Sequence, residues 1–122
     1  MNKIINLTQH ICTEEQKAQG VFEPKPEDKE VIKKLLTFNE IPSAEEIHKS
    51  AAFLTKFAKT YEVKEAMIGG ASYLMSSLEE ELYNQGIEPL YSFSVRESKE
   101  EHLSDGSVKK VNVFKHAGFV RV

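Results

Sequence analysis

The sequence predicts an α/β fold, a small Rossmann-like sandwich whose mostly parallel sheet carries a C-terminal antiparallel hairpin. Segments with the apolar pattern of strands alternate with segments of helical periodicity, and this order favours βαβ crossovers between parallel strands. A glycine pair, Gly69-Gly70, separates a predicted strand from a predicted helix. Near the C-terminus, Asp105-Gly106 lies between two apolar segments, which is typical of a hairpin turn.

The composition favours one soluble domain. The 122 residues fit a single Rossmann-like domain, residues 1–122. A net charge of -3 disfavours binding to long nucleic acid and leaves a small phosphate ligand open. The only cysteine, Cys12, favours a reducing compartment. The first apolar segment, residues 4–7, is too short for a signal peptide, and no apolar run approaches the roughly 20 residues of a membrane span. We therefore expect a cytoplasmic protein that does not enter membranes.

The N-terminal half begins with a short apolar strand at residues 3–7. A capping box, Thr13-Glu14-Glu15-Gln16, then predicts a short helix that stops at Gly20. Residues 21–26 contain two prolines and are predicted as an extended connection with room for a very short strand. An amphipathic helix follows over residues 27–38. A second capping box, Ser43-Ala44-Glu45-Glu46, opens the clearest helix of the chain, which we expect to run to about residue 60.

The C-terminal half predicts a second strand at residues 63–68 and, after the glycine pair, a helix that ends at Gly86 as its C-cap. A third strand is expected over residues 87–95. The polar residues 97–107 are predicted as a loop that turns at Asp105-Gly106. Residues 108–113 then pair back on the third strand, and residues 114–119 close the domain.

Polar residues follow each predicted parallel strand, where ligands bind in open α/β sheets. The pair Gly69-Gly70 allows a tight turn, and the helix N-terminus after it offers free N–H groups that suit an anion such as phosphate. The alternative is a plain strand-to-helix turn in which Ser72 caps the helix. The candidates are Thr8, Gln9 and His10 after the first strand, Gly69, Gly70, Ala71 and Ser72 after the second, and Ser92, Ser94 and Arg96 along the third.

Several side chains leave two interpretations open. His10 is either a general base or ligand contact, or a polar loop residue. Lys115 and His116 form a cationic pair that either contacts phosphate or lies on the surface. Cys12 is either a nucleophile at a helix start or, more commonly, a small buried residue. The four histidines lie far apart and lack the spacing of metal ligands, so no metal and no cofactor are predicted.

Four segments together resemble a known family. They are the His10 segment with Thr13-Glu14-Glu15-Gln16, the turn Ile68-Gly69-Gly70-Ala71-Ser72, the segment Ser94-Val95-Arg96-Glu97, and the ending Val113-Phe114-Lys115-His116-Ala117-Gly118-Phe119. In this pattern the chain resembles small CRISPR-associated proteins of the ring-nuclease kind, which are related to CARF-type Rossmann-like domains and belong to antiviral defence. The resemblance covers most of the chain, and the closing Phe-Lys-His segment is its most specific part.

The resemblance implies a homodimer that holds a cyclic oligoadenylate across its two-fold axis and cleaves it without a metal, by attack of a ribose 2′-hydroxyl. Two other functions remain open: a non-catalytic nucleotide-binding protein, acting as sponge or sensor, and an interaction module that binds a protein through its middle helices. Carried over by position, the catalytic candidates are His10, Arg96, Lys115 and His116, and the ligand-binding candidates are Thr8, Gln9, Gly69, Gly70, Ala71, Ser72 and Ser94.

Overall fold

Five strands form one mixed sheet in the order β2-β1-β3-β4-β5 in the computed structural model, which describes residues 3–122. Four strands are parallel: β1 (Ile4–Asn6), β2 (Val21–Phe22), β3 (Glu65–Met67) and β4 (Glu88–His102). The last strand, β5 (Val108–Arg121), runs antiparallel to β4. The predicted α/β class, with a mostly parallel sheet and a C-terminal antiparallel pair, is therefore confirmed.

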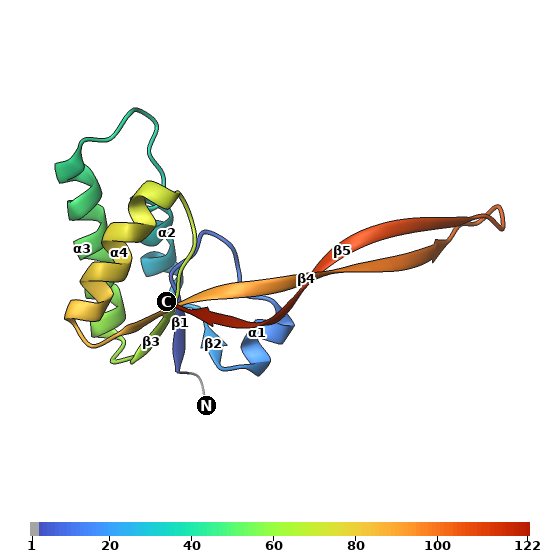
Figure 1. Ribbon diagram of the computed structural model, residues 1–122, viewed down its shortest axis with the longest axis horizontal. Coiled ribbons are helices and arrows are strands. Elements are labelled where there is room, and N and C mark those ends of the chain that lie inside the picture. Colours follow the sequence, from blue (N-terminus) through green and yellow to red (C-terminus); the bar gives the residue numbers. More distant parts are fainter. Residues whose placement is uncertain (1–2) are drawn as a thin grey trace.

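The helices lie on both faces of the sheet. The larger layer consists of α2 (Pro26–Leu35), α3 (Ala44–Thr60) and α4 (Ser72–Asn84), while the short α1 (Glu14–Ala18) packs on the other face, beside β2 and β5 (Figure 1). Among residues 3–122, no helix combines the length and the apolar character needed to cross a bilayer. Met1 and Asn2, which precede the apolar segment considered above as a signal peptide, lie outside the described residues.

Both predicted capping boxes are present. Thr13 accepts from the backbone N–H of Gln16 at the start of α1, and Ser43 does the same with Glu46 at the start of α3. In each box the third helical residue reaches back to the backbone of the cap, so two otherwise unpaired N–H groups are satisfied. Gly86 follows α4 at a positive φ of 71°, as expected for the residue that ends a helix.

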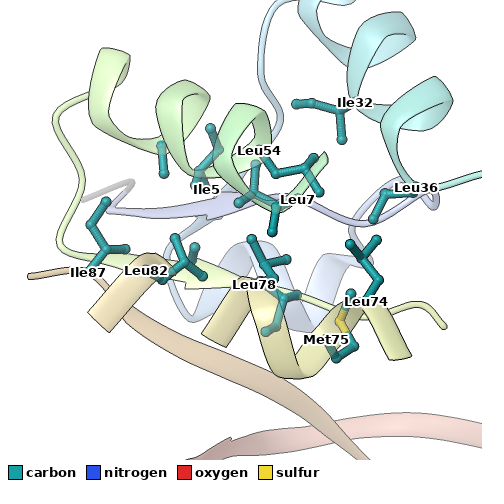
Figure 2. Close-up of a cluster of buried hydrophobic side chains, with 14 residues drawn as sticks. Ile5, Leu7, Ile32, Leu36, Leu54, Leu74, Met75, Leu78, Leu82 and Ile87 are labelled. Atoms are coloured by element: carbon teal, nitrogen blue, oxygen red, sulfur yellow. The ribbon is translucent and has the colours of Figure 1, made fainter. Parts of the chain in front are cut away.

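The main core fills the space between the three-helix layer and the sheet. Side chains from α2, α3 and α4 meet Ile5 and Leu7 of the first strand segment there, as Figure 2 shows. The opposite face of the sheet carries a smaller cluster around Ile4, which includes Cys12 and Leu90. Because successive residues of a strand point to opposite faces, β1 contributes to both clusters.

The predicted loop over residues 97–107 is wrong in most of its length. Strand β4 continues to His102, β5 begins at Val108, and only residues 103–107 form the turn, with Gly106 at a φ of 86°. We call residues 95–115 the arm, because this part of the hairpin extends away from the body (Figure 1). Its charges pair across the strands, as with Glu100 opposite Lys110, so a polar sequence forms a regular ribbon.

The other boundaries differ by a few residues. Two strands are shorter than predicted: β1 spans Ile4–Asn6 instead of residues 3–7, and β3 spans Glu65–Met67 instead of residues 63–68. The second helix begins at Pro26 and ends at Leu35, three residues before the predicted end. The chain leaves the helix there, and the hydroxyl of Thr37 donates to the carbonyl of Lys33. The predicted very short strand is present as Val21–Phe22.

Candidate functional site

A pocket of about 440 Å³, lined by polar and apolar residues, opens at the carboxyl ends of the parallel strands. The chain passes from β1 outward to β2 and later returns to β3 on the other side of β1. Crevices form at such a reversal, because the loops that follow the two neighbouring strands leave in opposite directions. The pocket is lined by residues after β1 and β3, by residues of β4 and by α1, and it brings together Thr8, Gln9, His10, Gly69, Gly70 and Ser92.

A buried side-chain network fixes the loop that carries Thr8 and His10. The Asn6 side-chain oxygen accepts from the N–H and the hydroxyl of Thr8 at 2.9 and 2.7 Å, and its amide donates to the His10 carbonyl at 2.7 Å. Lys29 Nζ donates to the carbonyls of Thr8 and His10, each at 2.9 Å, and forms a 2.8 Å ion pair with Glu23. The side chains of Asn6 and Lys29 therefore fix the backbone of the loop at Thr8 and His10, while the His10 side chain stays exposed.

Glu23 is an ionised carboxylate at the centre of this network. Burial by itself raises its pKa, but hydrogen bonds from Lys29, Asn6 and the Cys12 backbone outweigh burial and lower the pKa to about 2. The same surroundings act on Cys12 in the other direction, since burial and the neighbouring carboxylate raise its thiol pKa to about 11. Cys12 is 5% exposed and stays protonated near neutral pH, which supports its interpretation as a buried core residue rather than a nucleophile.

The Gly69-Gly70 turn forms the wall after β3. Gly70 has a φ of 152°, a conformation that side chains rarely adopt, and an added Cβ there would lie 3.4 Å from Cε of Met75. The N-cap of α4 is Ala71, which gives no side-chain hydrogen bond, and Ser72 is the first helical residue. Ser72 therefore does not cap the helix, and a plain strand-to-helix turn stays open as the alternative to a phosphate site. Unlike α1 and α3, α4 begins without a side chain bonded to its first N–H groups.

The wall formed by β4 contains a hydroxyl paired with an imidazole. Ser92 Oγ lies 2.6 Å from Nδ1 of His116, and Nε2 of the same ring lies 2.8 Å from the side-chain oxygen of Gln19. An amide oxygen only accepts, so the ring hydrogen is on Nε2 and Nδ1 accepts from the Ser92 hydroxyl. Gln16 Nε2 donates to Ser92 Oγ at 3.2 Å, which fixes the oxygen from the pocket side.

His116 itself lies behind the pocket wall. It is 6% exposed, and its ring centroid is 4.7 Å from that of Phe119. Burial lowers its pKa below the usual 6.5, against an opposing effect of Glu15. Near neutral pH the ring is therefore uncharged and able to accept a proton through the Ser92 oxygen. Of the predicted Lys115-His116 pair, Lys115 is exposed on the surface and His116 is buried.

Three predicted residues lie outside the pocket wall. Ser94 is exposed just before the arm, and Lys115 is exposed on it. Arg96, also on the arm, stacks on Phe114 with 6.0 Å between its guanidinium carbon and the ring centroid. Arg96 is four residues beyond Ser92 along an extended strand, which separates their Cα atoms by roughly 13 Å. Ala71 and Ser72 follow the pocket residue Gly70 at the start of α4.

Sequence reasoning missed Gln16 and Gln19. Gln16 was interpreted only as the helix end of a capping box, a role it does fill through its contact with Thr13. The two glutamines are three residues apart and therefore lie on the same side of α1. That spacing indicates a shared polar face, but it does not indicate the partners of the two glutamines. Ser92 and His116 lie 76 and 97 residues further along the chain.

These features define an α/β protein with a mixed five-stranded sheet and a pocket at its strand ends. The chain belongs to the family described as "Uncharacterized protein MJ1673 family", whose family model matches residues 2–120. No curated protein and no solved structure matches the chain.

Proposed function

We propose that the pocket binds a cyclic oligoadenylate and cleaves it without a metal. The observation that carries this proposal is the Ser92–His116 pair in the wall of the same pocket as the Gly69-Gly70 turn. The turn leads into an uncapped helix, whose first N–H groups suit a phosphate. The pair supplies a proton acceptor beside that phosphate. A phosphate ligand that carries its own hydroxyl uses both features.

The fold supports the same proposal. The strand order 2-1-3-4-5 is one of the two common orders of doubly wound nucleotide-binding sheets, and we assign the domain as a Rossmann-like variant on this ground. In such sheets the ligand lies where the strand order reverses, which here is the position of the pocket. The resemblance to ring nucleases adds the ligand class, a homodimer and a role in antiviral defence. The single cysteine, Cys12, favours a cytoplasmic location.

In the proposed reaction the ligand supplies the nucleophile. A ribose 2′-oxygen forms a bond to the adjacent phosphorus, the bond from phosphorus to the 5′-oxygen breaks, and the product ends in a cyclic 2′,3′-phosphate and a 5′-hydroxyl. The 2′-hydroxyl proton passes to His116 through Ser92, and the leaving oxygen takes a proton from His10 or from water. Gly69 and Gly70 bring backbone N–H groups to the phosphate oxygens. Positioning supplies much of the rate.

A non-catalytic sponge or sensor is the second candidate. The observation that favours it is the position of Arg96 and Lys115 on the arm, because the pocket of a single chain then has no lysine or arginine among the lining residues of the described part, 3–122. Such a pocket holds a ligand but stabilises the transition-state charge less well. A protein-interaction module is disfavoured, because that function needs no pocket with convergent polar groups such as His10 and Ser92 at the strand ends.

The test is incubation with cyclic tri-adenylate and cyclic tetra-adenylate in EDTA, followed by chromatography of the nucleotides. Linear products that end in a cyclic 2′,3′-phosphate support cleavage. Intact ligand that co-elutes with the protein supports the sponge or sensor. If neither ligand is cut or retained, both candidates are wrong. The matched variant is Gly69→Ala, whose added Cβ makes an ordinary 3.6 Å contact with Thr8 and fills space at the phosphate.

A further inference from the structure

The arm exposes two strand edges. Within the described chain, β4 pairs with β3 only over Glu88–Leu90 and then continues with β5 as its only neighbour. The outer edge of β5 has no strand beside it in the same residues 3–122. A two-stranded ribbon is marginally stable in water, and unpaired edges readily pair with another chain. The arm therefore requires a partner more than any other part of the fold.

The two edges differ in charge. The arm portion of β5 carries Lys109, Lys110 and Lys115 and no acidic residue. Two copies of this edge would bring like charges together, and lysines are a common protection of free edges against pairing. The edge of β4 instead alternates in sign, with Arg96, Glu97, Lys99 and acidic residues after it. Strand β4 is thus the edge on which a second copy can pair.

We propose that the free edge of β4 pairs antiparallel with the same edge of a second copy, about a two-fold axis at Ser98. In this register Glu97 lies opposite Lys99 of the second copy, and Arg96 lies opposite its Glu100. Two-fold symmetry repeats both contacts, so four pairs of opposite charge form. The register brings Phe93, 55% exposed and beside the irregularity at Phe93/Ser94, towards Leu103 of the second copy, 44% exposed and just past the end of β4. The strand is thus complementary to itself in charge and in apolar character.

The charges select one register. A shift of the axis by one residue places Glu97 opposite its own copy in one direction and Lys99 opposite its own copy in the other. Like charges directly opposite each other destabilise a strand pair. In the proposed register, by contrast, every charged residue from Arg96 to Glu100 meets the opposite sign.

The pairing also brings the second copy to the pocket. Phe93 directly follows the pocket residue Ser92. Leu103 of the second copy, which lies opposite Phe93 in the proposed register, begins the hairpin turn of that copy, residues 103–107. The turn of each arm therefore lies at the edge of the other copy's pocket, and the site is completed by two chains. The pairing of the two β4 edges is argued independently of the pocket's chemistry, whereas this consequence for the pocket rests on the proposed function.

The test measures molecular mass in solution without ligand, by sedimentation or light scattering. The wild-type chain is expected at twice its 13.9 kDa. Glu97→Lys and Lys99→Glu each place like charges at two contacts, and each is expected at the monomer mass. An equimolar mixture of the two variants restores both contacts and is expected to form a heterodimer. The double variant Glu97→Lys/Lys99→Glu restores the dimer within one sequence and shows that the arm still folds.

The matched control is Lys115→Glu, which reverses a charge on the β5 edge. Glu97, Lys99 and Lys115 all face a valine across the hairpin, so none of the changes disturbs a charge pair within the arm. Lys115→Glu is expected to remain a dimer. A monomeric wild type, a dimeric Glu97→Lys, a mixture that stays monomeric or a monomeric Lys115→Glu each contradicts the proposal. None of these outcomes depends on whether the pocket binds or cuts a nucleotide.

Discussion

The hydroxyl oxygen of Ser92 lies 2.6 Å from Nδ1 of His116, although the two residues are 24 positions apart on neighbouring strands. One member lines the pocket and the other is buried behind it. The contact gives the pocket a hydroxyl whose proton has an uncharged acceptor. It therefore connects the pocket wall to the only buried histidine among residues 3–122.

Ser92→Ala removes the proton path and is expected to lower the cleavage of cyclic oligoadenylate by about 100-fold, the usual scale of acid–base catalysis. Ligand binding should change little, because the backbone turn at Gly69-Gly70 is untouched. The measurement is single-turnover cleavage together with the dissociation constant. Ser76→Ala, at an exposed position of α4, is the control and should keep the wild-type rate. Equal rates for both variants would contradict a role for Ser92.

The rate is expected to fall at acidic pH as His116 takes up a proton. Burial lowers its pKa, so the uncharged form persists at pH 6.5 and the fall lies below that value. Gln19→Glu places a carboxylate beside Nε2 and should raise the pKa of His116, which moves the fall to higher pH. The measurement is the pH dependence of the cleavage rate for both proteins. A profile that Gln19→Glu leaves in place would count against His116 as the proton acceptor.

Stability is expected to fall between about pH 4.5 and pH 2 as Glu23 becomes protonated. Its folded pKa of about 2 lies below the usual 4.5, so its contribution is complete above pH 4.5 and is lost as the pH falls towards 2. Because the side chain is partly exposed, the contribution is on the order of 2 kcal/mol. Glu23→Gln should lose this amount at pH 7 and show a flatter pH dependence in urea unfolding.

The control for that experiment is Glu30→Gln. Glu30 forms an ion pair with Lys33 at 3.7 Å, and its side chain is 70% exposed. Exposed pairs contribute little to stability, so this variant should retain the wild-type pH dependence. The assignment of the acid sensitivity to Glu23 fails if Glu30→Gln flattens the curve equally.

Gly70→Ala is expected to destabilise the protein by about 1–3 kcal/mol, since a side chain is strained at a φ of 152°. The matched substitution is Gly118→Ala, where an added Cβ would meet open space. That variant should stay within about 0.5 kcal/mol of wild type in chemical unfolding. Equal unfolding free energies for the two variants would contradict the prediction, because they would show that the turn after β3 accepts a side chain at Gly70 without strain.

The elements predicted most accurately are those with a local cause. The capping boxes at Thr13 and Ser43 fixed the starts of α1 and α3, because a cap is formed by residues three positions apart. Gly86 and Gly106 marked a helix end and a hairpin turn through their positive φ angles. The pocket segments after β1 and β3 followed from the rule that parallel strands place their carboxyl ends together.

The arm was missed because its residues are polar on both faces. Residues 97–102 have no alternation of apolar and polar character, and a loop was the natural interpretation. What makes them a strand is the partner across the hairpin, where lysines of β5 meet the glutamates of β4. Arg96 and Lys115 were therefore expected at the pocket and instead lie beyond it on the arm.

By itself the sequence determined the α/β class, the helix caps, the turns and the polar segments around the pocket, because each depends on residues close together in the chain or on the general direction of parallel strands. Only the tertiary structure decided that Ser92 meets His116, that Lys29 and Glu23 hold the His10 loop, and that β4 extends past the body. These contacts join residues far apart in sequence, and their positions depend on how strands and helices pack together.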